Sequence, residues 1–195
     1  MRVNEIFYSL QGEGRHSGTA AVFVRLSGCN LRCPFCDTDH SGHTEMSEEQ
    51  IAGAVSQWPA PTVIITGGEP LLQLTSTLVE LLHQAGKRVH IETNGTIAPD
   101  SSTIEALDWI TVSPKDLYCK NAPLRIQRID EIKAVYQPGV DPSRYESITD
   151  CLYLQPCDTG QPRQNAAVIT ATINYIKEHP KWKLSLQTQK ILTER

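Results

Sequence analysis

The stretch GCNLRCPFCDT, at residues 28–38, holds three cysteines within eight positions. The chain of 195 residues has six cysteines at uneven spacing. This is not the regular framework of a secreted disulfide protein, and in a reducing compartment a tight group of thiols indicates metal binding or catalysis. A closed zinc site takes four ligands, and an iron–sulfur cluster usually takes four cysteines. Three thiolates therefore leave one coordination position where a substrate or cofactor can bind.

The other three cysteines are Cys119, Cys151 and Cys157. Cys119 is separated from the cysteine loop by at least two predicted strands, and the spacing of the three is irregular. We therefore expect them to be ordinary free cysteines rather than ligands of a second cluster.

Composition sets the class of protein. Hydrophobic residues make up 39% of the chain and charged residues 21%, which is typical of a globular protein, and the length predicts a single domain over residues 1–195. A net charge of -4 argues against a nucleic-acid partner. No apolar run reaches the roughly 20 residues that span a membrane, and the first residues lack the pattern of a signal peptide. We therefore expect a cytoplasmic protein with a small-molecule partner and no membrane contact.

Strand-like and helix-like segments alternate along the chain, which favours parallel β-α-β units. SEEQ at 47–50 is a capping box that predicts a helix to about Trp58. Pro70 predicts the first turn of a helix over 71–85, with Gly86 after its end. A further helix is predicted over 164–178, and residues 116–128 are predicted to be loop. The predicted strands are residues 3–8, 21–26, 62–66, 88–93, 109–113, 131–135, 152–155 and 183–187. The apolar residues of the predicted helix over 164–178 are Ala167, Ile169, Ile173 and Ile176.

Short polar motifs come directly after four of these strands. They are TGGEP at 66–70, TNG at 93–95, SPK at 113–115 and QPCD at 155–158. In α/β folds the loops at the carboxyl ends of parallel strands gather at one face, where the functional site lies. The sequence therefore predicts an incomplete parallel α/β barrel with its site at that mouth.

The CxxxCxxC loop after one strand and GGEP after the next resemble the radical S-adenosylmethionine (SAM) superfamily. The resemblance implies that Cys29, Cys33 and Cys36 hold a [4Fe-4S] cluster whose fourth iron binds SAM. It also implies that the reduced cluster cleaves SAM to a 5'-deoxyadenosyl radical, which abstracts hydrogen from the substrate. Phe35 would cover the adenine, and the GGEP backbone would bind the methionine amine. Paired glycines let the main chain approach a ligand closely, which is a physical reason for GGEP.

A second set of motifs spans nearly the whole chain. It comprises YSLQGEG at 8–14, FVRLSGC at 23–29, CDT at 36–38, SPK at 113–115, DEIK at 130–133, QP at 155–156 and LSLQTQK at 184–190. Together these resemble the 7-carboxy-7-deazaguanine synthases of the queuosine pathway. The resemblance implies a lyase that converts 6-carboxy-5,6,7,8-tetrahydropterin to 7-carboxy-7-deazaguanine with loss of ammonia. It also implies SAM, Mg2+, a homodimer, and an electron donor such as flavodoxin or ferredoxin.

The family pattern assigns roles to individual residues. Arg25 suits the substrate carboxylate because a guanidinium offers a planar pair of donors, and an unpaired charge in its apolar strand would be costly. Thr38 takes the Mg2+ position, and Glu92 and Asn94 are weaker cofactor candidates that could equally form capped turns. The pattern assigns substrate contacts to Leu10, Gln11, Gly12, Glu13, Arg25, Thr66 and Gln189. It assigns SAM contacts to Phe35, Cys36, Asp37, Gly68, Ser113, Pro114, Lys115, Gln155, Pro156, Cys157 and Asp158.

One position departs from the family pattern. Relatives have histidine where this chain has Gln189, and glutamine can replace one hydrogen bond but cannot carry a proton in the same way. The Arg195 carboxylate could also approach the site. His40 and His43 follow the cysteine loop, and we expect both to lie on a solvated loop rather than to bind metal.

Two alternative functions stay open at this point. The first is another radical SAM enzyme, such as an activase that makes a glycyl radical on a partner protein. The second is a non-catalytic iron–sulfur or zinc protein, which metal and sulfide analysis would distinguish.

Overall fold

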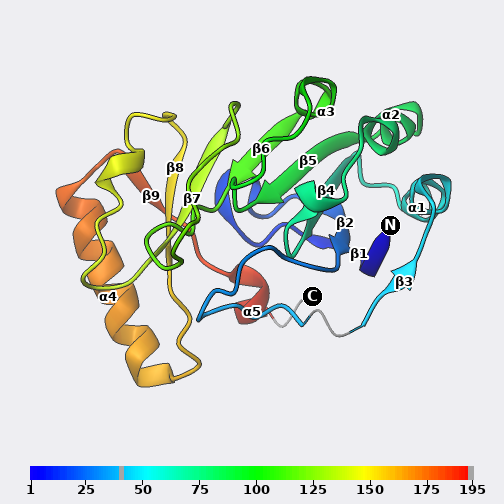
Figure 1. The fold of residues 1–195 in the computed structure, drawn as a ribbon. Coiled ribbons are helices and arrows are strands. Elements are labelled where there is room, and N and C mark those ends of the chain that lie inside the picture. Colours follow the sequence, from blue (N-terminus) through cyan, green and yellow to red (C-terminus); the bar gives the residue numbers. More distant parts are fainter. Residues whose placement is uncertain (40–41, 193–195) are drawn as a thin grey trace.

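The computed structural model describes residues 1–39 and 42–192. It forms one sheet of nine strands in the order β3-β1-β2-β4-β5-β6-β7-β8-β9 (Figure 1). The strands are β1 (Arg2–Leu10), β2 (Ala20–Leu26), β3 (Thr44–Glu45), β4 (Thr62–Gly67), β5 (Arg88–Thr93), β6 (Trp109–Val112), β7 (Glu131–Tyr136), β8 (Leu152–Pro156) and β9 (Trp182–Leu184). All eight predicted strands are present, and β3 is an addition.

The sheet is parallel from β2 through β4, β5, β6, β7 and β8 to β9. Only β1 and β3 deviate, because β1 runs antiparallel to β2 and β3 antiparallel to β1. β9 ends at Leu184, so the predicted strand over 183–187 is too long. Since each parallel strand is added beside the previous one, the carboxyl ends of these strands share one edge of the sheet.

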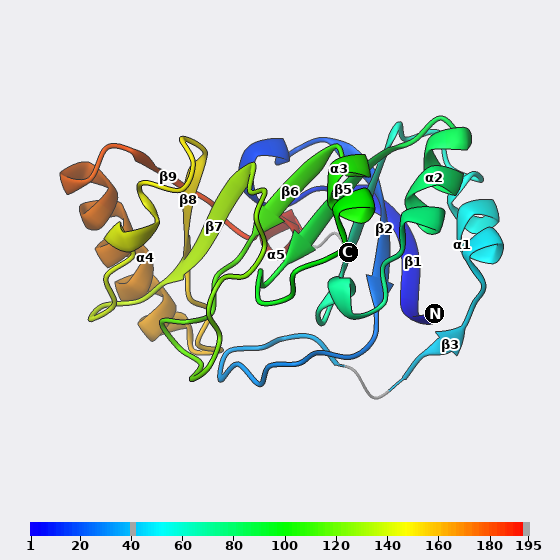
Figure 2. The same cartoon turned by 45° about the horizontal axis from the view of Figure 1, so that its top comes forward.

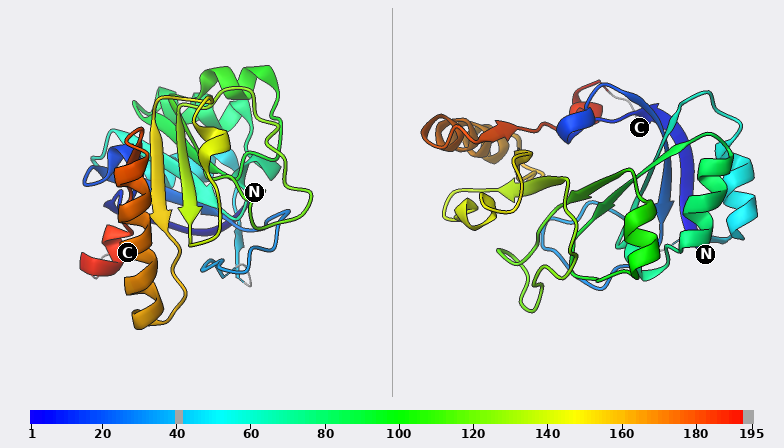
Figure 3. Two further views of the ribbon diagram at one scale, coloured as in Figure 1. Left: turned by 90° about the vertical axis from the view of Figure 1, so that its left-hand side faces the viewer. Right: turned by 90° about the horizontal axis from the view of Figure 1, so that it is seen from above.

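The sheet curves into an open arc rather than a closed barrel. β3 and β9 stand at opposite ends of the strand order, and the arc is seen from above in Figure 3. The helices are α1 (Glu48–Val55), α2 (Ser76–Gln84), α3 (Ser101–Ala106), α4 (Pro162–Glu178) and α5 (Thr188–Leu192), with 3-10 turns η1 (Gly14–His16), η2 (Pro70–Leu72) and η3 (Ser143–Tyr145). α1, α2 and α3 cover the outer side, whereas η1 and α5 lie close together on the concave side (Figures 2 and 3). The predicted incomplete barrel is confirmed in this open form.

The helix starts follow readable capping signals, with one error. Ser47 and Gln50 form the predicted capping box of α1. The single helix predicted over 71–85 is wrong: η2 follows Pro70, Gln73 leaves helical geometry, and Thr75 caps the separate helix α2. Thr75 accepts a hydrogen bond from the Leu78 amide at 3.2 Å, and this local cap competes with continuation of the first turn.

The outer face of the sheet carries the main core. Side chains from α1 and α2, including Ile51, Leu78 and Leu82, are fully buried against β2, β4 and β5. Complete burial of one such side chain contributes about 1.5–3 kcal/mol. No helix among the described residues has the length and apolarity that a membrane crossing requires.

α4 packs differently from the prediction. Its most buried residues are Val168 and Thr172, whereas Ala167 and Ile169 are exposed. The predicted apolar face over Ala167 and Ile169 is therefore wrong for those residues. Thr172 fits the interior because its hydroxyl donates to the Val168 carbonyl at 2.7 Å.

Candidate active site

A cavity of about 300 Å³ opens at the carboxyl ends of the parallel strands, on the concave side of the sheet. It is lined by the cysteine loop after β2, by the polar motifs after β4, β5, β6 and β8, and by the turn after β1. Every predicted site residue lines this cavity except Pro114, which is buried between two residues that do. The prediction that these distant motifs meet at one mouth is confirmed, because they line the same cavity. The role of each residue stays a prediction.

The three cysteines of the loop, Cys29, Cys33 and Cys36, all line the cavity. The Leu31 amide points at Cys29 Sγ at 3.4 Å, and the Cys36 amide donates to the Cys33 carbonyl at 3.2 Å. Within residues 1–39 and 42–192, no three His, Cys, Asp or Glu side chains are placed to share one metal ion. Three thiols from one loop at the same cavity supply the ligand type that iron–sulfur clusters use.

The pKa values of two of the loop thiols are raised, which favours their protonated form. Burial raises the pKa of Cys29. Burial, followed by a contact with Cys119, raises the pKa of Cys33 to about 12. Metal ligation must therefore displace protons from these thiols. Cys119 is a free cysteine, as expected, and its sulfur lies 3.6 Å from Cys33 Sγ.

The paired glycines of GGEP are needed for contact with the cysteine loop. A Cβ on Gly67, whose φ is +135°, would lie 2.0 Å from the Leu26 carbonyl oxygen. A Cβ on Gly68 would lie 2.2 Å from the Gly28 carbonyl oxygen. These glycines approach the backbone before Cys29 closely, and their close approach to a ligand stays a prediction.

Glu69 joins the ends of two neighbouring strands. Its carboxylate is fully buried and accepts hydrogen bonds from Leu71 N at 3.0 Å, Thr93 Oγ1 at 2.7 Å and Asn94 N at 2.8 Å. Burial raises the pKa of Glu69, and these donors oppose the rise. The acidic residue of GGEP thus holds the loops after β4 and β5 together, a role that sequence reasoning did not assign.

Asn94 connects the TNG loop to the cysteine loop. Its amide donates to Asn30 Oδ1 at 3.1 Å, and its own side-chain oxygen accepts from the Thr96 amide at 2.9 Å. These contacts correspond to the capped turn that the sequence left open as the alternative for Asn94.

The predicted SAM residues give the cavity polar and aromatic walls. Lys115 Nζ donates to the Ser113 carbonyl at 2.7 Å and to Ser113 Oγ at 2.6 Å, and burial lowers its pKa. The Phe35 ring packs edge-on against Tyr118, with centroids 4.8 Å apart. An aromatic ring held in this way presents a fixed apolar surface to a ligand base.

Lys190 of α5 bridges two loops at this mouth. Its ammonium lies 3.2 Å from Asp37 Oδ2 and 2.7 Å from Asp158 Oδ2. The hydrogen bond from Lys190, together with donors from Gly160 and Asn165, lowers the pKa of Asp158. The carboxyl-terminal helix is thereby attached to both predicted SAM loops.

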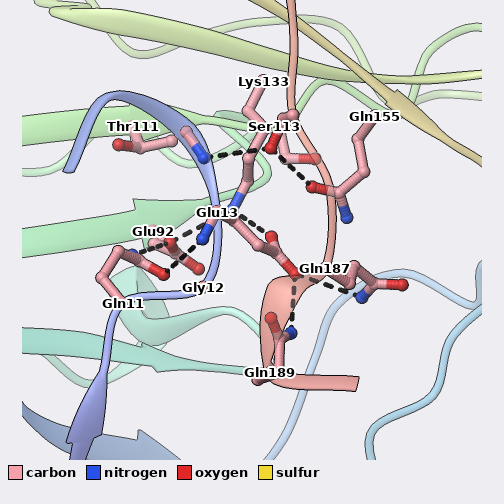
Figure 4. A network of polar contacts seen from close by, with 12 residues as sticks. Gln11, Gly12, Glu13, Glu92, Thr111, Ser113, Lys133, Gln155, Gln187 and Gln189 are labelled. Atoms are coloured by element: carbon pink, nitrogen blue, oxygen red, sulfur yellow. Dashed lines mark hydrogen bonds and ion pairs between the residues drawn. The ribbon is translucent and has the colours of Figure 1, made fainter. Parts of the chain in front are cut away.

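Glu13, which also lines the cavity, is the centre of a polar network (Figure 4). Its Oε2 accepts from Lys133 Nζ at 2.6 Å, and its Oε1 accepts from Gln187 at 3.1 Å and Gln189 at 3.0 Å. Lys133 also lies 3.1 Å from Glu92 Oε1, which accepts from Gln11 at 2.9 Å. Sequence reasoning missed Lys133 and Gln187 as site residues. The inward alternation of the predicted strand over 131–135 was the available signal for Lys133.

The network is charged at neutral pH. Burial acts to raise the pKa of Glu13, but the charge and hydrogen bond of Lys133 outweigh it and lower that pKa to about 2. Burial acts to lower the pKa of Lys133, but Glu13 and Glu92 raise it above its ordinary value. The structure therefore buries an ammonium between two carboxylates beside the cavity.

The segment after β9 clamps the turn after β1. Thr188 Oγ1 donates to the Gly12 carbonyl at 2.8 Å, and a Cβ on Gly12 would lie 1.9 Å from Gln189 Oε1. As long as the Gln189 side chain stays where it is, only glycine fits at position 12. Gln189 Oε1 is buried and has no hydrogen-bond partner among the described residues.

Arg25 is paired within the protein. Its Nε donates to Glu5 Oε1 of β1 at 2.9 Å, and its guanidinium lies 5.7 Å from the centre of the Phe7 ring. The cost of an unpaired charge in this strand is therefore avoided within the protein by Glu5, and the contact of Arg25 with a substrate carboxylate stays a prediction. A guanidinium has five N–H donors, so Arg25 can hold Glu5 and a second carboxylate together.

The remaining predicted positions have simple placements. Thr38 and Thr66 line the cavity. His43 is exposed on the loop after the cysteines, as expected. His40 and the Arg195 carboxylate lie outside the described residues.

The fold and the cysteine loop define a radical SAM protein. Residues 23–134 match the family model described as "Radical SAM superfamily". The chain belongs to this superfamily, whose members use SAM and a [4Fe-4S] cluster. A crystal structure of Streptococcus suis SuiB shares the fold, with a TM-score of 0.52, 14% identity, and coverage of 82% of this chain and 47% of that chain.

Within the superfamily, the chain belongs to the 7-carboxy-7-deazaguanine synthases. It is 49% identical to the synthase of Bacteroides thetaiotaomicron over 100% of this chain and 98% of that protein. It is 41% identical to the synthase of Bradyrhizobium diazoefficiens over 97% of each chain. The crystal structure of QueE from Escherichia coli superposes with a TM-score of 0.74 at 26% identity, covering 95% of this chain and 92% of that chain.

Proposed function

We propose that this chain is a lyase that converts 6-carboxy-5,6,7,8-tetrahydropterin to 7-carboxy-7-deazaguanine with loss of ammonia, in queuosine biosynthesis. One observation carries the proposal: the three loop cysteines and the network around Glu13 face the same cavity. Cofactors held by the cysteines and a substrate held by the network would therefore occupy the same cavity. Family membership supplies the reaction, and the shared cavity supplies a place for it.

The cysteine side would hold the initiating cofactors. Cys29, Cys33 and Cys36 would bind the cluster, which together with SAM supplies a 5'-deoxyadenosyl radical for hydrogen abstraction. Gly68 would offer its backbone to the SAM amine, Phe35 would pack on the adenine, and the loops around Ser113 and Gln155 would close over the rest. Lys190 would hold the Asp37 and Asp158 side chains in place for these contacts. The chain's own share is to orient the cofactor and exclude water.

The network side would hold the pterin. Pterin edges carry several N–H donors, and Gln189 Oε1 is a buried acceptor without a partner among the described residues. A buried polar atom without a partner is costly, so a ligand donor there would be stabilised. Arg25, fixed in position by Glu5, would bind the substrate carboxylate. Glu13 and Lys133 would keep the cavity wall rigid while the substrate rearranges.

Magnesium would bind beside Thr38. A single hydroxyl is a poor magnesium site, but Mg2+ keeps several waters and takes ligands from its substrate. The substrate carboxylate would therefore supply a further ligand to the ion. In Thr38→Ala we expect a higher half-saturating Mg2+ concentration in an activity titration. An unaltered titration curve would remove the metal role from Thr38.

The remaining assignments rest on family membership and on exposure. We propose one domain over residues 1–195, a homodimer in solution and a cytoplasmic location. Cys36 is exposed, so a one-electron donor such as flavodoxin or ferredoxin can approach the cluster from that side. Sedimentation analysis and donor-dependent turnover would test the dimer and the donor.

The experiment is an anaerobic reaction of the reconstituted protein with SAM, Mg2+, a reductant and the carboxypterin, with the product identified by mass spectrometry. The expected product is 7-carboxy-7-deazaguanine. SAM cleavage without this product would favour another radical SAM enzyme. One zinc per chain and no inorganic sulfide would favour a non-catalytic metal protein. Cys33→Ala, in which a thiolate is missing, should neither assemble the cluster nor cleave SAM.

A further inference from the structure

Cys119 lies against the cluster loop but outside the cavity. Its sulfur is 3.6 Å from Cys33 Sγ and 3.9 Å from the Arg32 carbonyl oxygen. Cys33 lines the cavity, whereas Cys119 is not among the lining residues. The second thiol therefore approaches Cys33 from behind and is not aimed at the space where a substrate or cofactor would bind.

The position of Cys119 is fixed by its own loop. The amides of Tyr118 and Cys119 donate to the Lys115 carbonyl at 2.9 and 2.7 Å. The Tyr118 hydroxyl donates to the Val135 carbonyl of β7 at 3.0 Å. These hydrogen bonds anchor the loop of Cys119 to a strand of the sheet, so its thiol is held close to Cys33.

The geometry is close to that of a disulfide. A disulfide bond is about 2.05 Å long, so the two sulfurs need to approach by only about 1.5 Å. The cysteine loop has weaker support than the strands, because it is connected to the sheet at Leu26 and is otherwise held by loop contacts such as Asn30 with Asn94. A shift of this size is within the range of ordinary loop motion.

A thiol pair in a cytoplasmic protein is more often a redox pair than a structural disulfide. We propose that Cys33 and Cys119 form a reversible disulfide when the cluster is not bound, with a low-molecular-weight disulfide such as oxidised glutathione as the oxidant. This goes beyond the proposed reaction and rests on the proposed function only for its consequence, which is that an oxidised Cys33 cannot bind iron.

The exchange balances in two steps. One cysteine thiolate attacks the oxidised glutathione, forms a mixed disulfide and releases one glutathione. The second cysteine attacks the protein sulfur of the mixed disulfide, forms the Cys33–Cys119 bond and releases the second glutathione. In total the two protein thiols lose two electrons and two protons. The two released glutathione molecules carry these electrons and protons away in their thiol groups. Excess reduced glutathione reverses both steps and restores the free thiol of Cys33, which can then bind the cluster.

Peptide mapping tests this on the cluster-free full-length chain. The protein is treated anaerobically with oxidised glutathione, its free thiols are alkylated, and it is digested with trypsin without reduction. Cleavage after Lys and Arg gives Cys119 in peptide 116–120, Cys29 in peptide 26–32, and Cys33 with Cys36 in peptide 33–87. We expect peptide 116–120 linked to peptide 33–87. A link to 26–32, a bond within 33–87, or alkylated Cys119 would overturn the proposal.

Variants assign the bond to one sulfur. Cys36→Ser should keep the link between the two peptides, and Cys33→Ser should lose it; the reverse pattern contradicts the proposal. The wild-type chain should lose two free thiols on treatment, whereas folded Cys119→Ser should lose none, and an equal loss in both would also contradict it. Circular dichroism checks that each variant is folded. Since mapping needs no cluster, SAM or pterin, its failure is distinguishable from failure of the proposed function.

Discussion

Glu13 and Lys133 lie 120 positions apart and form a 2.6 Å ion pair at the wall of the cavity. Lys133 projects from β7 in the sheet, and Glu13 stands in the turn after β1. The pair therefore attaches that turn to the concave face of the arc. Because Glu92 and two glutamines of the carboxyl-terminal segment share the same network, one buried ammonium fixes three separate parts of the cavity wall.

Replacing the ammonium leaves its partners unpaired. In Lys133→Met we expect a loss of about 3–5 kcal/mol in the free energy of unfolding, because Glu13 and Glu92 remain buried without a counter-charge. Urea unfolding of the cluster-free protein measures this. Lys177→Met, at an exposed position of α4, is the control and should change stability by less than about 0.5 kcal/mol. Equal, small effects in both variants would contradict the role of the pair.

Gly12 controls the position of Gln189. In Gly12→Ala the new methyl group meets Gln189 Oε1, so the side chain must move away from the substrate side of the cavity. We expect KM for the carboxypterin to rise about tenfold, which corresponds to about 1.4 kcal/mol, with a smaller change in KM for SAM. In Gly53→Ala, at an exposed position of α1, the added methyl group meets no neighbour, and both constants should stay the same. Unchanged pterin binding in Gly12→Ala would separate Gln189 from the substrate.

Arg25 is expected to bind a carboxylate with a planar pair of donors. Arg25→Lys keeps the charge but loses the planar pair, so carboxypterin should bind about 1.5–3 kcal/mol more weakly. Equilibrium binding to the cluster-loaded protein gives the difference. Glu5→Gln keeps the guanidinium and removes only the partner charge, and should weaken binding less than Arg25→Lys does. If Arg25→Lys bound as tightly as wild type, the carboxylate would have to be held elsewhere.

His90 makes the fold sensitive to mild acid. Burial, with smaller effects of His16 and Arg88, lowers the pKa of His90 from 6.5 to about 4. The unfolded chain therefore takes up a proton at this site below about pH 6.5, whereas the folded chain does so only near pH 4. The contribution of the neutral His90 to the free energy of unfolding is thus fully present above pH 6.5. As the pH falls toward 4, up to about 3 kcal/mol of this contribution is lost.

His90→Phe keeps a ring against His16 and Trp109 and removes the proton site. The free energy of unfolding should then vary less between pH 4 and 6.5 than in the wild-type chain. His43→Gln, at an exposed position, should follow the wild-type curve. A His90→Phe curve parallel to that of the wild type would exclude His90 as the source of the pH dependence.

The fold was largely predictable because its signals are local. Ser47 and Gln50 mark the start of α1, and the β-rich segments mark the strands. The errors arose where two local signals competed: Pro70 opens a turn, but Thr75 caps a new helix five residues later. Asp100, which caps α3 through the Thr103 amide at 2.8 Å, was a readable signal that the prediction overlooked.

The location of the site could be predicted from the sequence, but the partners of its polar side chains could not. Strand ends with polar motifs indicated where Cys29 and Gly68 would meet, because parallel strands bring their carboxyl ends together. Glu13 lies 120 residues from its partner Lys133, and Cys33 lies 86 residues from Cys119. Such contacts depend on how the loops close over the sheet, and nothing in the local sequence around either residue specifies them.

The most direct test of the central claim is an anaerobic crystal structure of the cluster-loaded protein with SAM and the carboxypterin. We expect the cluster on Cys29, Cys33 and Cys36, with SAM between this loop and Gly68. The pterin should lie against Gln189, with its carboxylate on Arg25. A pterin bound outside this cavity, or a single metal ion in place of the cluster, would contradict the account.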